Sequence, residues 1–300
     1  MPLIDARVRL PQDRRPDATY TMTGRAAESY DRVLNLTDKI NSGSLTALLE
    51  ALDAAGVRQA VMHAESEGGE SADALNAALV EVIDEYPDRF VGVGTVDLHE
   101  LRPRRACAQV DAAARVGLRG ICLEPAFFSL DIDDRLLYPV YARAEELGLV
   151  VAVHTGINYA RTHPIRHERP EMLDQVAVDF PELRLIAAHA GWPWATEFAA
   201  VARRHPTVFL EFGGLAPKYV ARAGTGWEVV FAMMPNLLRA QVLFATDWPV
   251  IDPVRALAEW RAAGLDAATL DSLLGGNAAA LFGLDRPTLG LDLDSWFGHA

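Results

Sequence analysis

Three apolar segments of the sequence end in side chains of types that enzymes use for chemistry. The segment LVVAVHTG carries His154 at its end, LRLIAAHAG carries His189, and VLFATDWP carries Asp247. Imidazoles and carboxylates transfer protons or ligate divalent metals. Apolar runs of this length, bounded by turn residues, are typical of parallel strands buried on both faces. We therefore expect the three side chains to meet at the carboxyl ends of neighbouring strands.

The elements that would position these residues alternate regularly along the chain. Strands are expected at residues 3–8, 59–64, 90–97, 118–125, 149–156, 183–191, 208–212 and 242–249, and helices at 45–52, 71–86, 106–116, 137–147, 171–180, 195–204, 254–263 and 267–282. Strict alternation implies a parallel sheet, and eight units in 300 residues predict one α/β domain, a (β/α)8 TIM-type barrel over residues 1–284. An open doubly wound sheet is the rival, but no glycine-rich phosphate fingerprint follows an early strand.

Three segments outside the regular elements stand out. Residues 11–41 are polar with little helical period, too long for a routine connection, so we expect a long loop over the barrel mouth, as a lid or a dimer contact. Residues 285–300 form a tail with an aromatic end that we expect to dock on a neighbour, which favours a homodimer. The segment 157–170 is densely basic. It contains Arg161, His163, Arg166, His167 and Arg169.

Composition excludes several classes of protein. The net charge of −13 argues against a nucleic-acid partner. No run approaches the roughly 20 uninterrupted apolar residues of a membrane helix, and the N-terminus has no secretory signal pattern. The only two cysteines, Cys107 and Cys122, form no CxxC motif. We therefore expect a cytoplasmic protein with a small-molecule partner.

Four motifs give the chain a resemblance to the amidohydrolase superfamily. VHTG, AHAGW, LFATDWP and GGNAAALFG match, in order, the branch with aminocarboxymuconate-semialdehyde decarboxylase, resorcylate-type decarboxylases and pyrone-dicarboxylate lactonase. The resemblance implies a metal-dependent-hydrolase-like barrel whose first strand carries Asp-x-His-x-His, with both histidines on a divalent metal. Here that frame reads Asp5-Ala6-Arg7-Val8-Arg9.

The two arginines make a metal site unfavourable. Guanidinium has no lone pair for a metal, and it does not deprotonate in proteins. A +2 ion about 4 Å from one guanidinium would be repelled by several kcal/mol at an effective dielectric constant near 20. We therefore expect no metal. The alternative is a single zinc or other divalent ion on His154, His189 and Asp247, the two-His-one-carboxylate set that remains.

Two interpretations of Arg7 and Arg9 stay open. They could fill the vacated site by pairing with Asp247 and perhaps Glu124, which would leave a stable and inert barrel floor. They could instead bind an anionic substrate, because guanidinium forks match carboxylates. We favour the second interpretation, since the resemblance includes family members that act on carboxylated lactones without metal.

The candidate catalytic residues are Asp247, His189 and His154. Asp247 would act as general base, with a structural ion pair to an arginine as the alternative, and the histidines would polarise a carbonyl group. Candidate substrate-binding residues are Arg7, Arg9, His63, Glu124, Asn158, Tyr159, Arg161, Trp192 and Trp248. Glu124 could equally be structural, and the tryptophans could equally belong to the core.

These residues predict an enzyme that acts on a small carboxylated molecule. The first hypothesis is a metal-free hydrolase of the amidohydrolase superfamily that opens a lactone or a similar ester or C–N bond. The second is a non-oxidative decarboxylase of an aromatic or muconate-type acid. The third is a barrel without catalytic activity that binds an acidic ligand.

Overall fold

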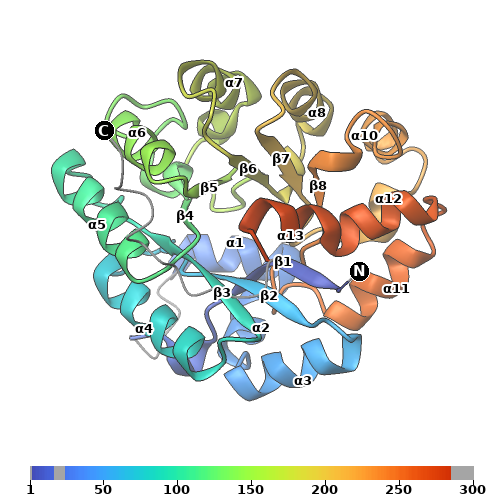
Figure 1. The fold of residues 1–300 in the computed structure, drawn as a ribbon, viewed down its shortest axis with the longest axis horizontal. Helices are drawn as coiled ribbons and strands as arrows, with labels where there is room; N and C mark the ends of the chain where they lie inside the picture. The colour runs from blue at the N-terminus through green and yellow to red at the C-terminus, as the bar shows by residue number, and fades with distance from the viewer. Residues whose placement is uncertain (1, 17–23, 285–300) are drawn as a thin grey trace, which may run out of the picture.

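The computed structural model describes residues 2–16 and 24–284 of the chain. Within them, eight parallel strands pair in the order β1 to β8 and curl into a barrel with helices outside (Figure 1). The strands are β1 Ile4–Arg9, β2 Gln59–His63, β3 Phe90–Thr95, β4 Gly120–Leu123, β5 Val150–His154, β6 Leu185–Ala188, β7 Val208–Glu211 and β8 Val242–Leu243. The predicted (β/α)8 barrel is confirmed.

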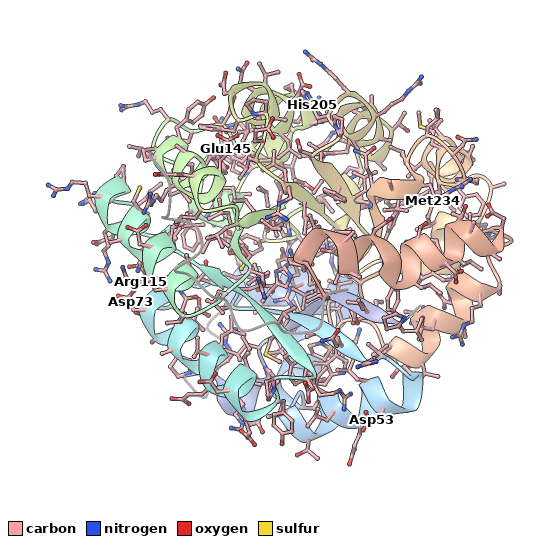
Figure 2. The ribbon with its side chains drawn as sticks, in the orientation of Figure 1. Asp53, Asp73, Arg115, Glu145, His205 and Met234 are labelled. Carbon is pink, nitrogen blue, oxygen red and sulfur yellow. The ribbon has the colours of Figure 1, made fainter. Side chains whose placement is uncertain are left out.

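A ring of helices packs on the outer face of the barrel. It comprises α3 Leu45–Ala55, α4 Ala72–Glu85, α5 Pro103–Arg115, α6 Tyr138–Glu146, α7 Pro170–Asp179, α8 Ala195–Arg204 and α11 Pro253–Arg261. Ser44 caps α3 as its sequence position predicts, because its hydroxyl accepts the Ala47 N–H at 3.2 Å. Acidic and basic side chains such as Asp53, Asp73 and Arg115 lie exposed on the outside of the ring (Figure 2).

The barrel interior is apolar at its amino-terminal end. Ile4, Val61, Val93 and Ile186 belong to one buried cluster there, and helix α13 Asn277–Phe282 covers that end (Figure 1). The prediction of a single helix over 267–282 is wrong. The segment is divided into α12 Ala267–Asp271, a wide turn Ser272–Gly276, and α13.

The first and last strands close the barrel through backbone hydrogen bonds. The Ala6 N–H donates to the Phe244 carbonyl at 2.9 Å, and the Asp247 N–H donates to the Arg7 carbonyl at 2.9 Å. Strand β8 ends at Leu243 rather than continuing to 249 as expected. The chain bends after it, and Asp247 has a φ of +53°. This bend lets the carboxylate of Asp247 turn toward β1.

The segment expected as a long loop over 11–41 contains two helices instead. Helices α1 Gly24–Leu34 and α2 Leu36–Asn41 were missed because most of their side chains are polar and few enter the core. Two short helices, α9 Pro217–Val220 and α10 Glu228–Met233, also lie where a long connection was expected. The tail 285–300 lies outside the described residues. In the part described, no helix has the length and apolarity to span a bilayer.

Candidate active site

A cavity opens at the carboxyl ends of the strands. Its volume is about 520 Å3, including the part open to solvent. Its charged and ionisable lining comes from Arg9, Glu67, His154, His189 and Asp247. The remaining lining residues, mostly apolar or aromatic, are Tyr30, Leu34, Leu36, Gly156, Ile157, Tyr159, Trp192, Gly214, Leu215 and Val250. The segment 24–41 thus supplies part of the wall.

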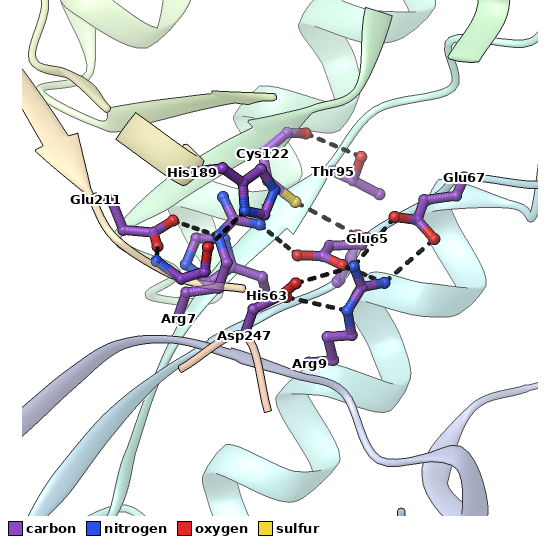
Figure 3. Close-up of polar contacts among 12 residues, drawn as sticks. Arg7, Arg9, His63, Glu65, Glu67, Thr95, Cys122, His189, Glu211 and Asp247 are labelled. Atoms are coloured by element: carbon purple, nitrogen blue, oxygen red, sulfur yellow. Dashed lines mark hydrogen bonds and ion pairs between the residues drawn. The ribbon is translucent and has the colours of Figure 1, made fainter. Parts of the chain in front are cut away.

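Arg7 lies behind this cavity in a buried ion-pair network (Figure 3). Its Nε donates to Glu211 at 2.6 Å, and one terminal nitrogen donates to Glu65. Strand β1 carries one extra residue relative to β2 between Asp5 and Val8. Such a bulge re-aims side chains. Two carboxylates therefore occupy Arg7, which does not line the cavity.

Arg9 lies at the edge of the cavity and contacts three carboxylates (Figure 3). Its Nε and one terminal nitrogen donate to the two oxygens of Asp247 at 3.0 and 3.3 Å. The other terminal nitrogen lies 2.8 Å from Glu65. The Arg9–Asp247 pair is the contact predicted by the first interpretation, in which the arginines fill the vacated metal site. Glu124, also named there, pairs with neither arginine in the contacts that the structure describes.

Burial and the guanidinium groups set the protonation of the carboxylates. Burial raises the pKa of Glu65, but Arg9 and Arg7 outweigh burial and lower that pKa to about 2. Burial and the Glu65 charge raise the pKa of Asp247 and the Arg9 guanidinium lowers it, with a net value of about 8. Burial also raises the pKa of Glu211, against the effect of Arg7. At neutral pH the network therefore contains an ionised Glu65 and a mainly protonated Asp247.

The two histidines at the strand ends lie side by side. Their ring centroids are 4.8 Å apart. His189 Nδ1 donates to the Gly213 carbonyl at 2.8 Å, so Nε2 is the nitrogen that remains for a ligand. Burial, together with the neighbouring His154 and Arg7, lowers the pKa of His189 well below its ordinary value. His189 is therefore neutral at physiological pH.

Glu168 positions His154. The two lie 2.9 Å apart between Nδ1 of the ring and Oε1 of the carboxylate, and the second Glu168 oxygen accepts the Asn158 N–H at 3.0 Å. The Glu168 side chain is fully buried. Such a contact fixes which ring nitrogen carries the proton and leaves Nε2 for the cavity.

Sequence reasoning missed Glu168, Glu211 and Tyr30. Glu211 ends an apolar strand, as His154 does, so the same strand-end argument could have found it. Glu168 lies in a basic loop and Tyr30 in a polar segment, where no comparable signal exists. Only glycine leaves room for the Glu211 carboxylate at position 213, because a Cβ there would lie 2.3 Å from a Glu211 oxygen.

The other residues proposed from the sequence lie in different places. Tyr159 and Trp192 line the cavity. His63 and Glu124 are buried and do not line it, and the His63 Nε2 lies 3.1 Å from the Ala6 carbonyl.

Three further candidates also lie outside the cavity lining. Asn158 accepts the Tyr30 hydroxyl at 3.1 Å, and Arg161 donates to Ser29 at 2.9 Å. Trp248 lines a separate hollow. Asn158 and Arg161 therefore have structural contacts, and the binding roles proposed for all three residues remain predictions.

The residues at the cavity floor do not fit a divalent metal. Among the described residues, no group of three or more histidine, cysteine, aspartate or glutamate side chains is placed to hold one. Both oxygens of Asp247 face N–H groups of Arg9, which lack a lone pair for a metal. The alternative set of His154, His189 and Asp247 therefore has its carboxylate already engaged.

The comparisons with known proteins identify the family. The family model described as amidohydrolase matches residues 4–284, and the chain belongs to that family. A curated relative is 2-amino-3-carboxymuconate-6-semialdehyde decarboxylase of Dictyostelium discoideum, which is 22% identical over 252 residues. The match covers 70% of this chain and 66% of that protein, so the chain spans just under two thirds of its relative.

Solved structures share the fold over nearly the whole chain. The uncharacterized TIM-barrel protein Bb4693 of Bordetella bronchiseptica is 26% identical, with a TM-score of 0.75, and 94% of this chain and 99% of that one are covered. The 5-carboxyvanillate decarboxylase LigW of Sphingomonas paucimobilis has a TM-score of 0.69 at 18% identity, with 94% and 99% covered. The Novosphingobium aromaticivorans 5-carboxyvanillate decarboxylase, solved with manganese, has a TM-score of 0.66 at 17% identity, with 94% and 96% covered.

Proposed function

We propose that the protein is a metal-independent decarboxylase of a small, flat carboxylic acid of the aromatic or muconate type. The observation that carries the proposal is that Asp247, held by Arg9, lines one cavity together with His154 and His189. Family membership supports an enzyme of this kind, and three of the relatives named above are decarboxylases of carboxylated aromatic or muconate compounds.

Asp247 would act as the proton donor. A general acid works best with a pKa near the working pH, and burial gives Asp247 a pKa of about 8. In the reaction, the bond between the ring or alkene carbon and the carboxylate breaks, and CO2 leaves. The electron pair of the broken bond stays on the ring or alkene carbon and forms the new C–H bond with the Asp247 proton. Solvent then returns a proton to Asp247, so atoms and charge balance.

The remaining cavity residues would bind and orient the substrate. The neutral His189 offers an Nε2 lone pair that accepts a hydrogen bond from a hydroxyl or amino substituent. Tyr30, Tyr159 and Trp192 provide aromatic surfaces that suit a flat ring. Such walls also keep water from the breaking bond, which strengthens the electrostatic effect of the charged floor.

Arg9 would supply a guanidinium at the barrel floor, and Arg7 would hold the carboxylates behind it. The carboxylates paired with the two arginines offset much of their charge, and Arg9 holds Asp247 by two hydrogen bonds. A manganese-bound relative shows that a metal is used elsewhere in this fold. In this chain we assign no step to a metal, because the carboxylate that would bind it is already engaged by a guanidinium.

Hydrolysis, the first hypothesis from the sequence, has less support. A hydrolase would use Asp247 as a base to activate water, which requires the ionised carboxylate, whereas burial favours the protonated one. The decarboxylase names among the relatives also agree better with the second hypothesis.

The test is to follow the carboxyl carbon. A panel of hydroxybenzoates and carboxylated muconate-type acids, labelled with 13C at each carboxyl group, is incubated with the protein in D2O. We expect one labelled CO2 for each product, and deuterium at the carbon that lost it. A labelled carboxylated lactone is included as the hydrolysis substrate, and a ring-opened product that keeps every carboxyl group and gains oxygen from water would instead establish hydrolysis.

A further inference from the structure

We propose that Glu67 is a resident carboxylate that occupies the substrate-carboxylate position on Arg9, and that binding of substrate displaces it. The inference rests on the proposed function for the class of ligand, a carboxylated small molecule. It assigns to Glu67 a role in specificity and to one edge of Arg9 the role of an anion subsite.

Among the described contacts of Arg9, three carboxylates face its guanidinium group. A guanidinium has five N–H donors in a planar fork. The edge formed by Nε and one terminal nitrogen faces both oxygens of Asp247. The edge formed by the two terminal nitrogens faces both oxygens of Glu67, each at 3.2 Å, and one of these nitrogens also lies 2.8 Å from Glu65. A substrate carboxylate gains a two-point contact with Arg9 only by displacing one of the three.

Glu65 and Asp247 are fixed in place. Glu65 is shared with Arg7, its side chain is 3% exposed, and it does not line the cavity. Asp247 is anchored through its backbone N–H to the Arg7 carbonyl at 2.9 Å. Displacing either one would leave buried carboxylates or guanidiniums unpaired, which is costly.

Glu67 differs from both in its surroundings. It lines the central cavity and also the two neighbouring hollows, one of which contains His99, Phe128 and His163. Gly68 and Gly69 follow it, and Gly69 has a φ of +86°, which suits glycine. A change of side-chain rotamer would therefore carry the Glu67 carboxylate into an adjacent hollow without moving a strand.

The edge of Arg9 that Glu67 covers is the one suited to a substrate. Glu67 and a bidentate carboxylate ligand present the same two oxygens to the same two nitrogens. With Glu67 in place, a second carboxylate would meet like charge at close range, so bound substrate and bound Glu67 exclude each other. Glu67 thereby weakens the binding of all carboxylate ligands, and it keeps the Arg9 guanidinium hydrogen-bonded while the cavity is empty.

The test is ligand binding, using salicylate and its neutral analogue salicylamide, with CO2 release recorded in parallel. Both are titrated into the wild-type protein and into Glu67→Gln, and binding is measured by calorimetry. Removing one like charge about 4 Å away should tighten salicylate binding by about tenfold or more. Salicylamide affinity should change by less than about twofold, because no ionic competition applies to it.

Glu70→Gln is the matched control. It removes the same charge from the same loop, at a residue that pairs with Arg15 at 2.8 Å and does not line the central cavity. Its salicylate affinity should equal that of the wild type. Thermal melting checks that each variant folds. If Glu67→Gln does not fold, Glu67→Ala replaces it, and the expected result is the same.

Three results would overturn the inference: no gain in salicylate affinity, an equal gain for salicylamide, or no salicylate binding by either protein. Because affinity and CO2 release are recorded separately for each protein, the binding result is separate from the proposed reaction. A gain in salicylate affinity without any CO2 release would support the role of Glu67 and would count against the decarboxylase.

Discussion

Replacing Arg7 by methionine tests how much the buried ion-pair network contributes to stability. Methionine keeps most of the length of the side chain and removes its charge, so Glu211 loses its guanidinium partner and Glu65 keeps only Arg9. Arg9 and Arg7 together lower the pKa of Glu65 from its ordinary value of 4.5 to about 2, so Arg7 contributes part of that stabilisation. Breaking buried pairs in other proteins costs about 3–5 kcal/mol. We expect a loss of that size at pH 7.5.

The loss should depend on pH in a defined direction. Without Arg7, the pKa of Glu211, which burial already raises, rises further above its value in the unfolded chain, and the pKa of Glu65 loses one of the two charges that lower it. Such groups destabilise the folded state at high pH, and this cost disappears as pH falls and they take up protons. The difference in unfolding free energy between wild type and Arg7→Met should therefore shrink between pH 7.5 and pH 5.

Urea unfolding followed by circular dichroism at both pH values measures the difference. Arg105→Met is the control, because Arg105 pairs with Asp97 at 2.8 Å while its side chain is 59% exposed. Exposed pairs contribute at most about 1 kcal/mol. Arg7→Met/Glu211→Gln should recover part of the loss, since it leaves one fewer buried charge. A loss below about 1 kcal/mol for Arg7→Met at pH 7.5 would refute the reasoning.

Three further predictions concern catalysis. Asp247→Asn should lower kcat for CO2 release by about 10²–10⁴-fold, the usual contribution of a general acid, while salicylate still binds; loss of binding alone would contradict this role. In a pH profile, kcat should fall as pH rises through about 8, because Asp247 then loses the proton it donates; an increase over that range would indicate a base instead. Glu168→Gln should lower kcat about tenfold or more with little change in KM and shift the 15N signals of the His154 ring, since its partner fixes the tautomer; an unchanged ring signal would mean that Glu168 has only a structural role.

The sequence predicted the barrel because its strands have a clear apolar pattern. Apolar runs such as the one ending in His154 repeat at regular intervals, and parallel strands buried on both faces have this pattern. The limits of β8 could not be predicted, because residues 244–249 are apolar enough to continue a strand. The bend that turns Asp247 toward β1 depends on contacts with that strand, which lies some 240 residues away in the chain.

The sequence predicted which residues form the candidate site better than it predicted which of them form ion pairs. The strand-end argument correctly brought His154, His189 and Asp247 together at one cavity. The partners of Arg7 depend on the bulge in β1, which aims its side chain at Glu65 and Glu211 and which composition does not reveal. Helix α1, which carries Tyr30 into the cavity wall, has only a short apolar face of Ala27, Tyr30 and Leu34 within a polar segment.

The measurement that tests the central claim most directly is the metal content of the active protein. The protein is purified in buffers treated with chelator and analysed for metals by mass spectrometry, and CO2 release is then measured with chelator and with added Mn2+. We predict no stoichiometric metal and the same rate of CO2 release under both conditions, because guanidinium groups hold Asp247. One bound metal ion per chain, with activity lost to the chelator and restored by Mn2+, would contradict the account.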